Sequence, residues 1–150
     1  MNLEDLLKNN LIKKVNPDFK QINFQIIRAK KDLETAKALM AKDLTWALTI
    51  IYHSMLRISR AMMYSKGFLP TTKNTHKTIV EFTKYTLGTD FYNLINRFDR
   101  LRRQRRSFIY ESENNITISE VNRATELAEE LFIKIEEIIK KENLQKNLFL

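Results

Sequence analysis

Apolar residues recur at intervals of three and four along most of the chain, which is the spacing of one face of an α-helix. The clearest stripe predicts a helix over about residues 17–42. Asn16, Pro17 and Asp18 supply an N-cap, a first-turn proline and a first-turn acid in that order, which is typical of a helix start. A weaker apolar stripe predicts a preceding helix over residues 3–14.

The next predicted helix is apolar on almost every side, so we expect it to be the central element of the fold. Asp43 can cap its first turn, and Gly67 is the residue type that most often ends helices in the left-handed conformation. The loop after Gly67 is the longest one expected. Asn74 or Thr75 is expected to cap the helix that follows.

The rest of the chain predicts three further helices. They cover residues 75–87, about 89–110, and a long segment that follows Thr117. Thr117 and Glu120 have the spacing of a capping box, in which each side chain accepts from a free amide of the first turn. The polar stretch 111–115 is expected to be a turn.

Composition agrees with a helical chain of 150 residues. Average usage would give roughly ten Gly and seven Pro, whereas this chain has two of each, too few for folds that need many turns. We therefore predict an all-α fold, an up-and-down bundle of five to six helices. It forms a single domain over residues 1–150, with a core over about 17–142 and the helix 3–14 as an addition.

Several classes of protein are not expected from this sequence. The absence of Cys excludes disulfides, thiolate metal sites and cysteine nucleophiles. No apolar run approaches the roughly 20 residues that cross a bilayer, and the first ten residues carry acids where a signal peptide carries bases. These features predict a cytoplasmic protein with no membrane contact.

The net charge of +8 is distributed unevenly. Residues 1–110 contain 21 Lys and Arg against 9 Asp and Glu, whereas residues 111–150 contain 5 against 9. Six arginines fall within residues 97–106, opposed only by Asp99. This concentration predicts a local cationic site.

Arg105 interrupts the apolar face of the predicted helix 89–110. It lies in the middle of that face on a helical wheel, which otherwise carries Phe91, Leu94, Ile95, Phe98, Leu101 and Ile109. Burying a guanidinium costs several kcal/mol unless partners offset it. Arg105 is therefore expected to meet an acidic partner, a subunit interface or an anionic ligand; the alternative is a side chain that extends past an apolar rim into water.

A neighbouring face of the same helix carries Asp99, Arg103, Arg106 and Tyr110. Arginine forks match phosphate oxygens, and rings such as Tyr110 and Phe108 could stack on a base. The alternatives for such an arginine run are a solvated face or a strip that docks a partner protein.

The two histidines do not predict a metal site, because neither has Cys or a suitably spaced carboxylate beside it. His53 lies in the apolar central helix and is expected to be a hydrogen-bonded core residue. His76 is expected at the surface in the first turn of its helix. No glycine-rich phosphate loop or metalloprotease motif is present, so we expect no cofactor and no metal.

Two passages of the chain resemble the HEPN domain family (higher eukaryotes and prokaryotes nucleotide-binding). The first is ALTIIYHSMLRISRAMMYSKGFLP followed by NTHKTIVEF, and the second is FDRLRRQRRSFIYE. With the last helix, the resemblance covers about residues 20–142 in the expected order. It implies a bundle of four or five helices that is frequently dimeric, with Arg-x4-His residues of both subunits meeting in a cleft.

Family members include metal-independent ribonucleases, and many are paired with a small nucleotidyltransferase in toxin–antitoxin systems. By resemblance, Arg105 matches the family arginine, Arg106 stands where Asn or another polar residue is usual, and Tyr110 stands where catalytic members have His. Arg105 and Tyr110 are thus the candidate catalytic residues. Because tyrosine ionises near pH 10, Tyr110 is a poor replacement for a general base of pKa near 7.

We therefore expect a HEPN-type homodimer that binds nucleotide or RNA phosphate through its arginine-rich helix, as one half of a toxin–antitoxin pair. One alternative is a metal-independent ribonuclease toxin in which Tyr110, His53 or His76 replaces the missing histidine. The other is a non-catalytic helical module that docks a nucleotidyltransferase partner. The candidate binding residues are Arg102, Arg103, Arg105, Arg106, Tyr110 and His76.

Overall fold

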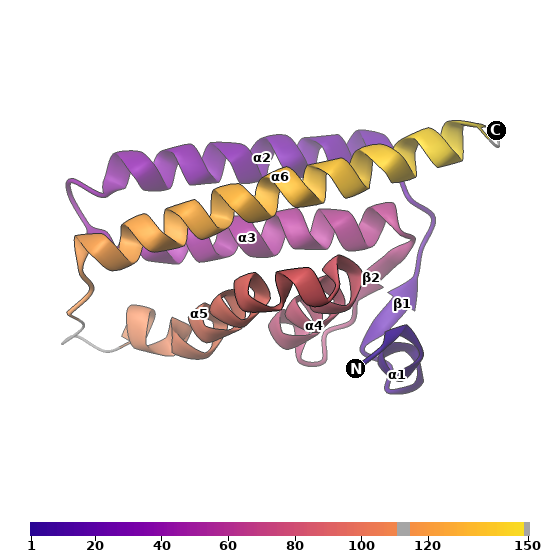
Figure 1. Ribbon diagram of the computed structural model, residues 1–150, viewed down its shortest axis with the longest axis horizontal. Coiled ribbons are helices and arrows are strands. Elements are labelled where there is room, and N and C mark those ends of the chain that lie inside the picture. Colours follow the sequence, from indigo (N-terminus) through magenta and orange to yellow (C-terminus); the bar gives the residue numbers. More distant parts are fainter. Residues whose placement is uncertain (111–114, 149–150) are drawn as a thin grey trace.

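Long helices packed side by side make up most of the computed structural model, which describes residues 1–110 and 115–148. Figure 1 shows α2, α3 and α6 running along the bundle, with α4 and α5 beneath them. The predicted all-α fold is confirmed. The helices are α1 (Leu3–Lys8), α2 (Phe19–Leu39), α3 (Leu44–Ser65), α4 (Thr75–Leu87), α5 (Tyr92–Tyr110) and α6 (Ile118–Leu148).

Helix α3 is the centre of the core, as its apolar sequence predicts. It packs against α2, α4, α5 and α6, and most of its side chains are buried. The Asp43 carboxylate caps it by accepting from the Trp46 amide at 3.0 Å. The chain leaves the axis of α3 at Gly67, two residues after the helix ends, and the φ of 88° at Gly67 lies in the region that favours glycine.

The prediction of one helix over residues 3–14 is wrong. Helix α1 ends at Lys8, and Asn10 has a left-handed φ of 56° that turns the chain into a short strand, β1 (Ile12–Lys14). This strand pairs antiparallel with β2 (Phe68–Pro70), which occupies part of the expected loop. The pairing buries Ile12 and ties the N-terminal segment to the chain beyond α3.

The other helix boundaries follow the predicted pattern with local changes. Helix α2 is capped by Asp18 rather than Asn16, because the Asp18 carboxylate accepts from the amides of Lys20 and Gln21. A 3₁₀ turn over Thr89–Phe91 leads into α5. The Thr117 hydroxyl accepts from the amide of Glu120 at 3.1 Å, as its half of a capping box requires.

Helix α5 contributes Leu94, Ile95, Phe98 and Phe108 to the core. Phe108 is therefore not available to stack on a base, which corrects that expectation. The side chain of Ile109 and most of the predicted turn 111–115 lie outside what the structure describes. Within the described part of the chain, no helix has both the length and the apolar character needed to cross a membrane.

Candidate functional site

Arg105 points into the bundle rather than into open solvent. Its side chain is partly buried, and its guanidinium makes a hydrogen bond with Nδ1 of His76, in the first turn of α4. The inward position predicted for Arg105 on the helical wheel is therefore what the structure has. The partner within this chain is a histidine ring rather than a carboxylate.

The same nitrogen of His76 also lies 3.0 Å from the hydroxyl of Tyr52, a residue of α3 that is 1% exposed. A guanidinium carries only donors, so Nδ1 must accept, and the Tyr52 hydroxyl must donate to it as well. The proton of the neutral His76 ring is then on Nε2. Arg105, His76 and Tyr52 thus join α5, α4 and α3 through one acceptor atom.

His76 is held in its neutral form. Burial of the ring and the positive charge of Arg105 lower the pKa of His76 to about 4, with smaller contributions from His53 and Arg102. Burial raises the pKa of Tyr52 to about 12, which keeps its hydroxyl protonated as a donor. At neutral pH the positive charge of this group therefore comes from Arg105 alone.

His53 does not lie in the core, which corrects the expectation for this residue. It is exposed on α3, and its ring lies 6.1 Å from that of His76, measured between centroids, at nearly a right angle. Partial burial of the ring and the charges of Arg105 and Arg57 lower the pKa of His53, against an opposing effect of Asp32. The two histidines are therefore neighbours at one edge of a pocket.

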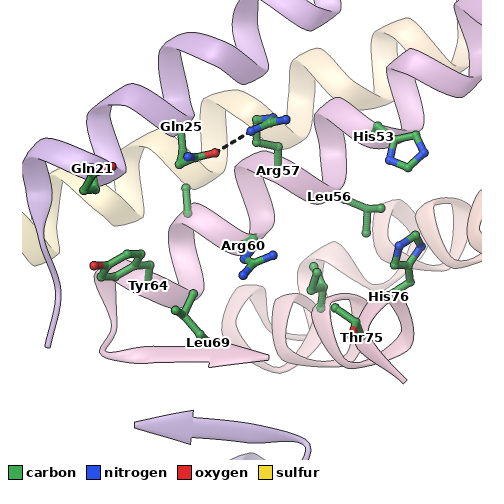
Figure 2. A pocket seen from close by; sticks show the side chains of 12 residues that line it. Gln21, Gln25, His53, Leu56, Arg57, Arg60, Tyr64, Leu69, Thr75 and His76 are labelled. Atoms are coloured by element: carbon green, nitrogen blue, oxygen red, sulfur yellow. Dashed lines mark hydrogen bonds between the residues drawn. The ribbon is translucent and has the colours of Figure 1, made fainter. Parts of the chain in front are cut away.

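This pocket, the histidine pocket, has a volume of about 630 Å³ and lies among α2, α3, α4 and β2. Figure 2 shows the polar side chains placed around this space, with Arg57 turned toward Gln25 and Arg60 between Tyr64 and His76. Its lining residues are Gln21, Gln25, His53, Leu56, Arg57, Arg60, Ala61, Tyr64, Leu69, Thr75, His76 and Ile79.

The lining of the histidine pocket contains two arginines and no acid. Arg57 donates to Oε1 of Gln25 at 2.7 Å, and its Nε lies 3.4 Å from a carboxylate oxygen of Asp32, so its charge is partly compensated. Arg60 is exposed and has no ion-pair partner among residues 1–110 and 115–148. The pocket therefore has an excess of positive charge and several hydrogen-bond donors.

The other predicted binding residues do not gather at this pocket. Arg102 and Arg103 both pair with Asp99, with Nε to carboxylate distances of 2.7 and 3.3 Å. Arg106 is exposed, and Tyr110 is 79% exposed at the end of α5. The predicted group is thus divided: His76 lines the pocket and contacts Arg105, whereas Arg103, Arg106 and Tyr110 are exposed on α5.

Sequence reasoning missed Arg57 and Arg60, although a signal was present. His53, Arg57, Arg60 and Tyr64 are spaced by four, three and four residues, so they share one face of α3. Such a polar stripe on the most apolar helix indicates a cavity or a partner at that face. The donor set of two histidines without a carboxylate does not fit a metal ion, and the described residues contain no cluster of three metal-ligating side chains.

The low pKa of His76 predicts that the fold is less stable in mild acid. The pKa of His76 is about 4 in the folded state and about 6.5 when unfolded, so the unfolded chain takes up this proton first as pH falls. Stability is thus fully present above pH 6.5 and is lost as pH falls toward 4. We expect this group to lower the free energy of unfolding by at most about 2 kcal/mol between pH 7 and pH 5, because solvent screens a ring that is only half buried.

Urea unfolding of the wild type and of His76→Gln at both pH values measures this contribution. The wild type should lose more stability than the variant between pH 7 and pH 5, because glutamine does not titrate. Equal losses in the two proteins would show that the pKa of His76 is close to its ordinary value.

Comparison with protein families supports the passages singled out in the sequence. A family model described as HEPN domain matches residues 22–139, which run from α2 into α6 and include the whole histidine pocket except Gln21. A search of curated proteins found no match.

Proposed function

Because the chain belongs to the HEPN domain family, we propose that its histidine pocket binds the phosphate of a nucleotide or of RNA. Arg57 and Arg60 are the primary phosphate ligands in this proposal. Arg105 adds positive charge behind His76, which it contacts, and His76 donates from Nε2. The single observation that carries the proposal is the excess of arginine over acid around a pocket of about 630 Å³.

The physical reason is charge compensation. Arg60 has no acidic partner in the described part of the chain and Arg57 is compensated only in part by Asp32, so a phosphate can neutralise the remaining charge while accepting hydrogen bonds from both. The apolar lining residues Leu56, Leu69 and Ile79 offer a surface for a sugar or a base next to the phosphate. Arg103, Arg106 and Tyr110, exposed along α5, are positioned for the backbone of a longer RNA.

Replacing Arg60 with alanine should weaken binding of a fluorescently labelled RNA at least about tenfold, since a charged hydrogen bond contributes roughly 1.5–3 kcal/mol. Binding is measured by fluorescence anisotropy over a salt series, and the slope of log K against log salt should decrease in magnitude by about one. Lys42→Ala is the matched control, because it also removes one exposed positive charge but lies in the turn after α2, at the end away from Gln21 and Gln25. Equal affinities of Arg60→Ala and Lys42→Ala for RNA would refute the proposal.

A second candidate is metal-independent RNA cleavage in the same pocket, and the pair of histidine rings 6.1 Å apart favours it. One histidine would take the proton of a 2′-hydroxyl, and the 2′-oxygen would attack phosphorus. The other would protonate the departing 5′-oxygen, giving a cyclic phosphate and a 5′-hydroxyl end. The lowered pKa of His53 keeps its ring neutral, as a base requires. Nδ1 of His76 already accepts from Arg105 and Tyr52, so His76 is the acid of this pair and must be charged by the approach of the phosphate.

Cleavage of a labelled RNA in the presence of EDTA tests this candidate. His53→Ala and His76→Ala should each reduce the rate by about 100-fold or more if both rings transfer protons. Tyr110→Phe should leave the rate unchanged, because Tyr110 lies outside the pocket lining. No cleavage by the wild type, or a loss only in Tyr110→Phe, would exclude the histidine pair as the catalytic groups.

The homodimer, the nucleotidyltransferase partner and the toxin–antitoxin role stay predictions of the family resemblance.

A further inference from the structure

A second pocket, the arginine pocket, lies between α5 and α6. It has a volume of about 270 Å³ and is bounded by α5, the first turns of α6 and the N-terminal part of α3. Figure 1 shows the start of α6 above the C-terminal half of α5 in this region. The arginine pocket shares no lining residue with the histidine pocket.

Three guanidinium groups line this small space. Arg97 and Arg100 come from α5 and Arg123 from α6, and Glu120 is the only acid in the lining. Arg97 donates to the backbone carbonyl of Arg123 at 3.3 Å. Arg123 in turn donates to the hydroxyl of Ser119 at 3.2 Å. These contacts hold the arginines at the pocket without neutralising them.

Arg100 and Glu120 are not paired with each other. Neither side chain has an ion pair or a side-chain hydrogen bond within the described part of the chain, although both line the same pocket. With three arginines against one carboxylate, the lining has two positive charges in excess. Like charges gathered in this way favour an anion that carries two negative charges.

The floor of the arginine pocket is apolar. Leu48, Ala124 and Leu127 are each less than 5% exposed and lie in its lining together with Leu101. Apolar atoms exclude water from one side of the site, which strengthens the attraction between the guanidinium groups and an anion. The exposed arginine ends still make this attraction sensitive to salt.

We propose that the arginine pocket is a second anion site that binds a phosphate group, either as a free small phosphate or as the terminal phosphate of a nucleic acid. A carboxylate has two oxygens and satisfies one guanidinium fork, whereas a phosphate has three or four oxygens around a tetrahedral centre and can accept from three. The charge of a phosphate monoester or of inorganic phosphate also matches the two uncompensated arginines.

Calorimetric titration with inorganic pyrophosphate tests the site in the Arg60→Ala background, which weakens the histidine pocket. Adding Arg100→Gln and Arg123→Gln should reduce pyrophosphate affinity at least about tenfold. Adding Lys140→Ala instead, an exposed charge far along α6, should not change it. Thermal unfolding checks that the variants fold. Unchanged pyrophosphate affinity in a folded Arg100→Gln/Arg123→Gln protein overturns the proposal.

Two oligonucleotides identify the source of the phosphate. A 5′-phosphorylated RNA and its 5′-hydroxyl counterpart are compared in the same background. If the phosphorylated RNA binds at least about tenfold tighter, and Arg100→Gln/Arg123→Gln abolishes this preference, the ligand is the end of a nucleic acid. Dependence on Arg100 and Arg123 for pyrophosphate alone indicates a free small phosphate. Both results support a phosphate site in the arginine pocket. Tighter binding of a glutamate-rich peptide than of pyrophosphate in this pocket would refute the proposal. Because the background already lacks Arg60, these outcomes do not depend on the histidine pocket.

Discussion

Arg105→Ala is expected to weaken binding of RNA or of a nucleoside monophosphate at least about tenfold at pH 7. The substitution removes a positive charge that contacts the lining residue His76, and with it the donor that orients His76. It also removes a cause of the low pKa of His76, so the pKa of His76 should rise from about 4 toward 6.5.

The two effects of Arg105→Ala make its binding defect depend on pH. At pH 7 the His76 ring stays neutral in the variant and the lost charge is not replaced. At pH 5 the ring gains a proton in the variant but much less in the wild type, which restores part of the charge. The affinity ratio of wild type to Arg105→Ala should therefore be smaller at pH 5 than at pH 7, measured by anisotropy at fixed salt. A ratio that grows as pH falls would contradict the electrostatic role of Arg105.

Phe98→Ala is expected to lower the free energy of unfolding by about 3–5 kcal/mol. The Phe98 side chain is fully buried in α5, and its ring packs edge-on against that of Tyr52 with centroids 6.1 Å apart. Removing it leaves a cavity directly behind the residue that donates to His76. The variant should therefore lose phosphate affinity as well as stability, because Tyr52 loses its support.

Phe24→Ala is the matched control for this prediction. Phe24 lies on α2 and is 53% exposed, so its loss should cost less than about 1 kcal/mol. Urea unfolding at pH 7 compares the two variants. Similar destabilisation by both substitutions would mean that α5 does not pack against α3 through Phe98 as described.

The parts of the fold that depend on local signals could be predicted from the sequence. Asp43 and Gly67 bound α3 because capping and left-handed termination are properties of a few adjacent residues. The pairing of β1 with β2 could not be predicted in this way. Each strand has three residues, too few for a period, and the pairing joins Ile12 to Pro70 across most of the N-terminal half.

In the candidate site, too, local features could be predicted from the sequence and contacts between distant segments could not. The inward direction of Arg105 follows from the periodicity of a single helix, whereas its contact with His76 depends on how α4 lies against α5. The spacing of Arg57 and Arg60 with His53 and Tyr64 places them on one face of α3 and indicates a cavity or a partner there, whereas the other elements that line the pocket follow only from the tertiary packing. The place of Tyr110 in the motif is visible in the sequence, whereas its exposure depends on how α5 packs.

Nuclear magnetic resonance of the two imidazole rings tests the central claim most directly, because the chain has only His53 and His76. Adenosine monophosphate is added at pH 7, and the pKa of each histidine is measured with and without it. Binding in the histidine pocket should shift the signals of both rings and raise the pKa of His76 above its value of about 4, since the phosphate offsets the charge of Arg105. Signals and pKa values that stay unchanged at a concentration of nucleotide that saturates the protein would contradict it.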